Sequence, residues 1–247
     1  MSDTALSRAE QDYLKAIYHL QRKEQAGRVG TVALAKWLGV SAASVTSMVK
    51  KLAEADLASH HPYQGVALTE MGERAALEML RHHRLLETFL SEHLGMPWHE
   101  VHAEADRLEH ALSETLEDRL ADALGNPTVD PHGAPIPTKD GRVEMPPTVP
   151  LWSVAAGQCV RIVEVEDEDA ALLAHLADLG LRPGTTVEVL TRGPFGGPLH
   201  VRIGTKEHAL GEVVAGAIAV VPLGAEAAAR GVAHDRTREG TGYDRQG

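Results

Sequence analysis

The segment at residues 125–150, GNPTVDPHGAPIPTKDGRVEMPPTVP, most constrains what this 247-residue chain can fold into. It is rich in proline and glycine, and it shows neither the period of a helix nor the alternation of a strand. Apolar residues before it are spaced for helices, whereas after it Val and Ile alternate with polar residues in short runs. The sequence therefore predicts a mainly α protein followed by a small all-β domain.

Capping signals predict three helices in the first third of the chain. Ser, Thr or Asp before an apolar-periodic run accepts hydrogen bonds from the first helical N–H groups, and glycine ends a helix in the left-handed conformation. The expected helices are residues 8–22, opened by the Ser7–Glu10 capping box, residues 32–38, opened by Thr31 and stopped by Gly39, and residues 42–56, opened by Ser41.

The run after the third helix, LASHHPYQGVALT, reads as two short strands around a turn at residues 63–65. Two helices joined by a short glycine-containing turn and followed by a hairpin are typical of a winged helix-turn-helix. The alternative is a plain three-helix bundle with a hairpin. Although the net charge of the chain is −11, residues 28–51 hold four Lys or Arg and no acid, which favours a confined DNA-contacting surface.

The third helix has the residue types that DNA contact requires. Its start is lined by small and hydroxyl side chains, so it can lie deep in a major groove, and Lys50 and Lys51 can reach phosphates. An ordinary solvated helix face is the alternative that charge alone leaves open.

Two further helices are expected at 75–94 and 98–124, with leucine-rich stripes and an acidic balance of 13 Asp or Glu to 5 Lys or Arg over residues 75–140. We expect these helices to dimerise. On a helical wheel, His83 and Glu87 share a stripe with apolar residues, so they need a partner when buried. His102, Asp106, Glu109 and His110 fall within about a 100° sector.

A divalent cation would serve both groups, although each acid–histidine pair taken alone could be an ordinary helix contact. Oxygen and imidazole donors without a thiolate suit Mn(II) or Fe(II), while the general affinity order still places Zn(II) above manganese. Asp12 by itself is only an early-helix acid, which the helix dipole explains.

Short runs over residues 153–223 predict the strands of a small barrel with one helix at about residues 170–179. The expected domains are 1–74, a winged helix-turn-helix; 75–140, a helical metal-binding and dimerisation domain; 141–152, a linker; 153–223, the barrel; and 224–247, a disordered tail.

Four stretches resemble the diphtheria-toxin-repressor family of metal-dependent transcriptional repressors. They are QDYLKAIYHL, VSAASVTSMVKKLAEADL, RHHRLLETFL with VHAEADRLEHALSE, and GNPTVDPHGAPIP; residues 153–223 are similar to the family's SH3-like, FeoA-type domain. The resemblance implies a homodimer that represses metal uptake genes by binding palindromic double-stranded operator DNA.

The resemblance also implies residue roles. It assigns a primary metal site to Asp12, Asp106, Glu109 and His110, an ancillary site to His83, Glu87 and His102, and DNA contacts to Ser41, Ala43, Ser44 and Ser47.

Iron-regulated members carry Met and Cys where this chain has Asp12 and Asp106, whereas manganese-regulated members carry carboxylates. Mn(II) is therefore the expected cofactor, with Fe(II) as the alternative and Co, Zn or Cd as substitutes in vitro. Two-domain manganese regulators have an acid where this chain has Lys15, which argues against a bridged two-ion site. Within the third domain, residues 166–169 (EDED) are the nearest ligand candidates.

Other readings are weaker. HEVH at 99–102 lacks the His-Glu-x-x-His spacing of zinc hydrolases, and no nucleophile triad or phosphate loop is evident, so we expect no enzyme. A regulator that senses something other than metal, a regulator that also activates some promoters, and a barrel that serves mainly as a protein-interaction module stay open. No run approaches a membrane span and no signal pattern opens the chain, so a cytoplasmic protein without a membrane partner is expected.

Overall fold

The computed structural model describes residues 6–23, 27–61, 64–144 and 146–223, and these form two compact units. The first unit comprises Met1–Leu86, Ala103–Thr128 and Ile136–Glu144, and the second comprises Glu87–His102, Val129–Pro135 and Met145–Gly247. The tail expected to be disordered, residues 224–247, lies outside the described residues.

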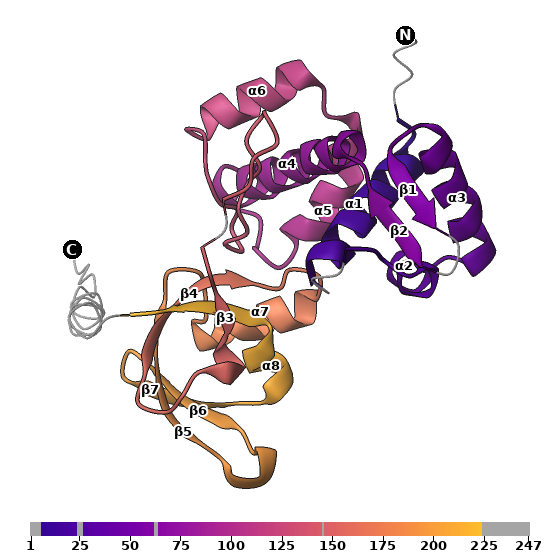
Figure 1. Cartoon of the computed structure of the whole chain (residues 1–247). Coiled ribbons are helices and arrows are strands. Elements are labelled where there is room, and N and C mark those ends of the chain that lie inside the picture. The colour runs from indigo at the N-terminus through magenta and orange to yellow at the C-terminus, as the bar shows by residue number, and fades with distance from the viewer. Residues whose placement is uncertain (1–5, 24–26, 62–63, 145, 224–247) are drawn as a thin grey trace, which may run out of the picture. The chain divides into compact units, whose positions relative to one another are not determined.

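The first unit opens with the predicted winged helix-turn-helix (Figure 1). The contact from Glu10 back to the predicted cap is present, because the backbone N–H of Ser7 donates to Oε2 of Glu10 at 2.8 Å and the Ser7 hydroxyl donates to the same oxygen. Ser41 caps the third helix by accepting from the N–H of Ser44 at 3.1 Å. Thr31 does not act as a cap: it is the first helical residue, and Gly30 before it offers no side chain. The elements are α1 (Arg8–Lys23), α2 (Thr31–Leu38), α3 (Ala42–Glu54), β1 (Ala58–His61) and β2 (Gly65–Leu68).

An isolated β-bridge holds the wing against the segment just before α2. Val29 and Val66 exchange both backbone hydrogen bonds, at 2.8 and 2.9 Å. Gly65 beside this bridge has φ +99°, and a Cβ there would lie 2.4 Å from the carbonyl oxygen of Val29, so only glycine fits. Aliphatic side chains from all the elements fill the core beneath, including Leu14, Ile17, Leu34, Val45, Val49, Leu52 and Val66.

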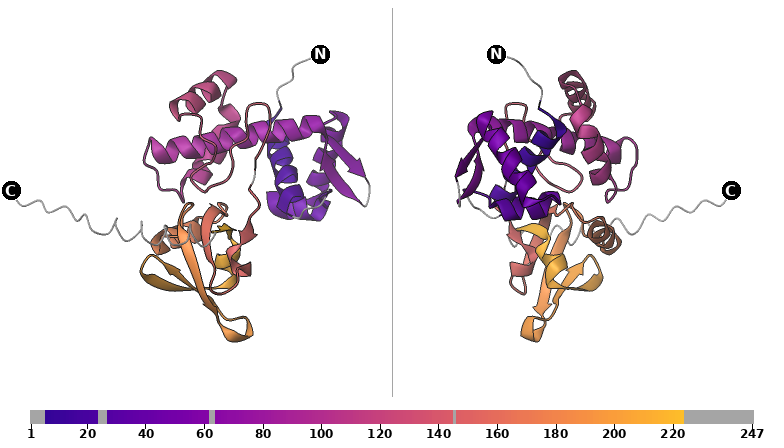
Figure 2. Two further views of the ribbon diagram at one scale, coloured as in Figure 1. Left: turned by 60° about the vertical axis from the view of Figure 1, so that its left-hand side comes forward. Right: turned by 90° about the vertical axis from the view of Figure 1, so that its right-hand side faces the viewer.

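Helix α4 (Glu70–Glu92) starts directly after the hairpin, as Figure 2 shows in purple and magenta. The single helix expected over residues 98–124 is wrong. The chain forms α5 (Val101–Leu108) and a 3-10 turn (Glu109–Ala111), then restarts as α6 (Glu114–Ala123). The break has a local cause: Leu112 is extended, and the hydroxyl of Ser113 accepts from the N–H of Leu116 as a new N-cap.

The second unit contains a six-stranded antiparallel sheet in the order β3-β8-β4-β5-β6-β7. Its core is mainly aliphatic, in keeping with the low aromatic content, and Trp98 is among its buried members. The expected helix at 170–179 is confirmed. Two strands were not predicted: β3 lies in the segment expected to be a linker, and β7 has the largely polar sequence KEHAL. The elements are β3 (Val149–Pro150), β4 (Cys159–Val165), α7 (Ala170–Leu179), β5 (Thr186–Arg192), β6 (Leu199–Ile203), β7 (Lys206–Leu210), α8 (Glu212–Gly216) and β8 (Ile218–Pro222).

Within the described residues, no single helix has both the length and the apolar character needed to cross a membrane. Only the bent pair α2 and α3 meets that test, by length and composition alone.

Candidate metal centres

The first cluster of possible metal ligands joins α1 to the turn after α5, within the first unit. Asp12, Glu109 and His110 each present a donor atom within 4.8 Å of the others. Nε2 of His110 lies 3.0 Å from Oδ1 of Asp12, and Nδ1 of the same ring lies 2.7 Å from the side-chain oxygen of Gln11. Both nitrogens of this ring therefore face oxygen atoms, and Nε2 is the nitrogen directed at Asp12.

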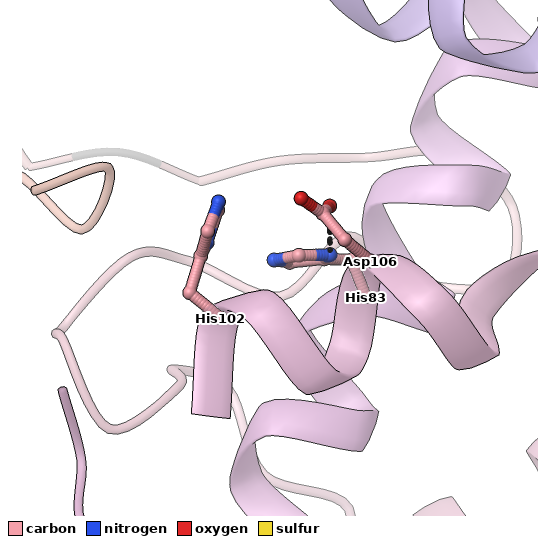
Figure 3. A group of neighbouring side chains, drawn as sticks. All are labelled: His83, His102 and Asp106. Carbon is pink, nitrogen blue, oxygen red and sulfur yellow. Dashed lines mark ion pairs between the residues drawn. The ribbon is translucent and has the colours of Figure 1, made fainter. Parts of the chain in front are cut away.

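Glu109 is the centre of a second set of contacts in the same unit. Its side chain is 1% exposed, and Oε2 lies 2.6 Å from Nδ1 of His83 on α4. Nδ1 of His83 also lies 3.3 Å from Oδ1 of Asp106, the ion pair drawn in Figure 3. The ammonium group of Lys15, on α1, lies 3.0 Å from Oδ1 of Asp106 and 2.7 Å from Oε1 of Glu109.

These neighbours set the charges of the cluster. Burial alone would raise the pKa of Glu109, but the hydrogen bond with His83 and the charge of Lys15 bring the pKa below its usual value. Burial raises the pKa of Asp12 despite the opposing charge of His110. Burial disfavours the charged form of Lys15, but Glu109 and Asp106 outweigh it and raise the pKa of the ammonium group. Glu109 is therefore a buried carboxylate that needs cationic neighbours.

A second cluster lies wholly in the second unit. Glu87, Asp130, His132 and Asp167 each offer a donor atom, all within 4.8 Å of one another. Glu87 and His132 are 0% exposed, and Nδ1 of His132 lies 3.8 Å from Oε1 of Glu87. His102 adjoins them, with Nδ1 at 3.2 Å from Oε1 of Glu87 and 3.8 Å from Oδ2 of Asp167.

A tight loop presents Asp130 and His132. Oδ1 of Asp130 accepts from the backbone N–H groups of His132 and Ala134, at 2.8 and 3.0 Å. Gly133 has φ +89°, and a Cβ there would lie 1.8 Å from the carbonyl oxygen of Val163 on β4, so a side chain cannot be accommodated.

The ring of His132 is held in one tautomer. Nε2 lies 2.8 Å from the carbonyl oxygen of Trp98, which can only accept, so Nε2 carries the proton. Nδ1 is buried and has no hydrogen-bond partner among the described residues. A neutral imidazole with one N–H on a carbonyl and the other nitrogen turned to carboxylates is the usual form of a metal-binding histidine.

The structure thus regroups the residues that the sequence singled out. Asp12, Glu109 and His110 lie together, Asp106 joins them through Lys15, and Nδ1 of His83 faces Glu109 and Asp106. Glu87 and His102 lie together, and Asp167 is the member of the 166–169 run beside them. Sequence reasoning missed Asp130 and His132, which stand in the proline- and glycine-rich segment. The only local signal there was the Asp-x-x-Gly turn pattern.

The expected DNA-contacting residues all lie on the exposed side of α3. Ser41, Ala43, Ser44, Ser47, Lys50 and Lys51 are exposed. The two lysines differ in their surroundings, because Nζ of Lys51 lies 3.2 Å from Oε1 of Glu10. Lys50 and Lys51 also line a surface concavity with Ala43, Thr46, Ser47 and Glu54.

A winged helix-turn-helix joined to helices that bear clustered carboxylates and imidazoles defines a DNA-binding regulator of the metal-dependent class. Family models match almost the whole described chain: an iron dependent repressor N-terminal DNA binding domain over residues 5–66, an iron dependent repressor metal binding and dimerisation domain over 69–138, and a FeoA domain over 149–222. The chain belongs to the diphtheria toxin repressor family of metal-dependent, DNA-binding transcriptional repressors.

Some of the similar proteins are named iron-dependent repressors, and others are named manganese-dependent repressors. The iron-dependent repressor IdeR of Mycobacterium tuberculosis is 34% identical over 200 residues, which cover 75% of this chain and 84% of the relative. The diphtheria toxin repressor of Corynebacterium efficiens is 31% identical over 189 residues, covering 72% of this chain and 81% of the relative. A solved manganese-dependent transcriptional repressor in complex with manganese is 42% identical, with a TM-score of 0.80, and the match covers 87% of this chain and 100% of that one.

Proposed function

We propose that this chain is a Mn(II)-responsive repressor that controls metal uptake genes in the cytoplasm and has no enzymatic activity. The observation that carries the proposal is the contact of Asp12 on α1 with His110 after α5, at 3.0 Å. This contact joins the DNA-binding domain to the turn after α5, and both side chains are donors of the types that Mn(II) accepts.

The donor set favours manganese. The proposed primary centre consists of Asp12, Asp106, Glu109 and His110, which offer three carboxylates and one imidazole. Neither thiolate nor thioether is among them, and Cys159, the one cysteine of the chain, lies on β4 of the other unit. Hard oxygen donors suit Mn(II) better than the soft-ligand metals. Co, Zn and Cd are expected to substitute in vitro.

Lys15 limits the number of metal ions that the primary centre can hold. Its ammonium group contacts Asp106 and both carboxylate oxygens of Glu109, so a positive charge already lies beside these two ligands. A second divalent ion beside it would meet like-charge repulsion at short range. We therefore assign a single ion to the primary centre.

The second cluster supplies a separate, ancillary centre. Glu87, His102, Asp130, His132 and Asp167 are its proposed ligands. His83, which the family resemblance assigns to this centre, has its Nδ1 against Glu109 and Asp106 in the first unit. Asp167 comes from the FeoA-type domain, which gives that domain a part in metal sensing rather than in protein interaction alone.

The regulatory step follows from the placement of the ligands. Asp12, Asp106, Glu109 and His110 would hold the cation, whose charge would neutralise the carboxylates and link α1 to the segment after α5. Asp12 then holds the DNA-binding domain at one orientation, and two such domains in a homodimer present their α3 helices at the spacing of a palindromic operator. Because DNA selects the same conformation, metal and DNA each raise the affinity for the other. Ser41, Ala43, Ser44 and Ser47 face the bases, and Lys50 and Lys51 the phosphates.

Fe(II) is the second candidate signal, because the curated relatives IdeR are named iron-dependent. Binding of the full chain to promoter DNA from a neighbouring metal-transporter gene separates the candidates. We expect tight binding with Mn(II), weaker binding with anaerobic Fe(II), and little without metal. Equal binding with and without metal contradicts the proposal, and equal responses to both ions remove the assignment to manganese.

A further inference from the structure

A third group of possible ligands lies in the first unit and shares no residue with either centre. Glu78 and His82 stand one turn apart on α4, and Glu114 is the first residue of α6. Each offers a donor atom, and the three atoms lie within 4.8 Å of one another. Side chains four residues apart share a helix face, which explains why Glu78 and His82 meet.

His82 is the residue that sets this group apart from an ordinary acidic patch. It is 4% exposed, and its Nε2 lies 3.0 Å from Oε2 of Glu117 on α6. Its Nδ1 is buried and has no hydrogen-bond partner among the described residues. A buried imidazole nitrogen without a partner is costly, and it needs an explanation.

The contacts of Glu117 fix the tautomer of this ring. Glu117 is buried, and its Oε1 lies 2.5 Å from Nε of Arg81, so the carboxylate is held in place and charged. A charged carboxylate only accepts, so Nε2 of His82 carries the proton and Nδ1 presents a lone pair. Carboxylate, histidine and metal in this order form the arrangement that orients metal-binding histidines in general.

The two carboxylates provide the rest of the donor set. Burial raises the pKa of Glu78, and the nearby charge of Glu114 raises it further, so the two acids repel each other. Lys139 approaches Glu114 at 3.5 Å but is more than half exposed, and it also pairs with Asp118. Lys139 can therefore keep its ion pair with Asp118 when Glu114 binds a divalent cation.

We propose that Glu78, His82 and Glu114 form a third divalent-cation site that ties the start of α6 to α4. Two carboxylates and one imidazole suit Zn(II), Co(II) or Mn(II), with water completing the coordination. The site stabilises the packing of α6 in the helical region, and it stands independently of the two centres proposed for sensing.

Metal counting on the full chain tests the site. Wild type and the Glu114→Gln variant are dialysed against Co(II), and bound metal is counted by mass spectrometry. We expect the variant to bind about one equivalent fewer, or to bind that equivalent at least about tenfold more weakly, as loss of a ligand or its support does. Glu78→Gln should do the same, and both side chains are exposed, so neither change threatens the core.

Asp122→Asn is the matched control, because it removes the same charge from an exposed position on α6 outside the group. It should bind as much Co(II) as wild type. Anomalous diffraction from a Co(II)-soaked crystal should place an ion against Nδ1 of His82. Equal counts for wild type and both Gln variants, or no ion at His82, overturn the proposal while leaving the sensing centres untouched.

Discussion

The ammonium nitrogen of Lys15 lies 2.7 Å from Oε1 of Glu109, a residue 94 positions further along the chain. The same nitrogen lies 3.0 Å from Oδ1 of Asp106. The positively charged side chain of Lys15 thus lies among the proposed ligands of the primary centre. Any ion that binds there shares Asp106 and Glu109 with Lys15 or displaces it, so Lys15 weakens metal binding while it stabilises the protein without metal.

Replacing this lysine by an uncharged residue should therefore separate affinity from stability. In Lys15→Met, we expect the Kd for Mn(II) at the primary centre to fall at least about tenfold, because a positive charge a few ångströms away is removed. The metal-free variant should be less stable by about 3–5 kcal/mol, because Glu109 keeps a buried charge with fewer partners. Calorimetric titration and urea unfolding measure the two effects.

Lys36→Met, at an exposed position on α2, is the control and should change neither quantity by a comparable amount. A Lys15→Met protein that binds Mn(II) no more tightly than wild type would show that Lys15 does not compete with the metal.

The capping box at Ser7 and Glu10 predicts a pH-dependent stability. The hydrogen bonds from Ser7 lower the pKa of Glu10, so this carboxylate stabilises the fold above its ordinary titration range and loses that contribution as the pH falls through it. Ser7→Ala should cost about 1 kcal/mol near neutral pH. The difference from wild type should shrink in acid. Urea unfolding at several pH values measures it, and a cost that stays constant with pH rules out the ionised Glu10 as its source.

The two lysines of α3 should contribute unequally to DNA binding. Lys51 contacts Glu10 at 3.2 Å, whereas Lys50 has no ion pair among the described residues. In the metal-loaded protein, Lys50→Gln should weaken operator and non-operator DNA alike and reduce the slope of log K against log salt by about 0.9. Lys51→Gln should have the smaller effect, since the ion pair with Glu10 already neutralises part of the charge of Lys51. Anisotropy titrations over a salt series measure both, and equal slopes for the two variants contradict this ranking.

Much of the fold was predictable because its signals are local. The Ser7–Glu10 box and Ser41 mark the first turns of α1 and α3, and the alternating runs mark β4 and β5. The break between α5 and α6 was missed because the leucine period continues across Ser113, whose capping role depends on a single hydroxyl.

The centres were less predictable because their contacts are remote in sequence. Wheel geometry selected His83, Glu87 and the 102–110 ligands, but it could not bring Lys15 to residues more than 90 positions away. Asp130 and His132 were missed because no period marks them. Their place depends on the packing of the loop at Gly133 against β4, which is long-range information.

The second centre can be tested at His132, which the sequence left unmarked. His132→Gln keeps a donor for the carbonyl oxygen of Trp98 but replaces the imidazole nitrogen that faces Glu87. We expect about one equivalent of Mn(II) per chain to be lost, or its Kd to rise about 10–100-fold, while the primary centre keeps its ion. His175→Gln, exposed on α7, is the matched control. Unchanged metal counts in His132→Gln would exclude His132 as a ligand.

The choice of metal should depend on Asp106. A thiolate at this position adds a soft donor, which favours Fe(II), Co(II) and Zn(II) over Mn(II). In Asp106→Cys, we expect the metal concentration for half-maximal operator binding to rise at least about tenfold for Mn(II) and to fall for Co(II). Glu104→Cys, on the opposite face of the same helix, controls for a new thiol and a lost carboxylate that lie away from the ligands. Because Asp106 also contacts Lys15 at 3.0 Å, the double variant with Lys15→Met shows whether the change in metal preference comes from the donor atom or from a released lysine. A Mn(II) response that survives unchanged in Asp106→Cys would remove Asp106 from the primary centre and, with it, the sequence argument for manganese.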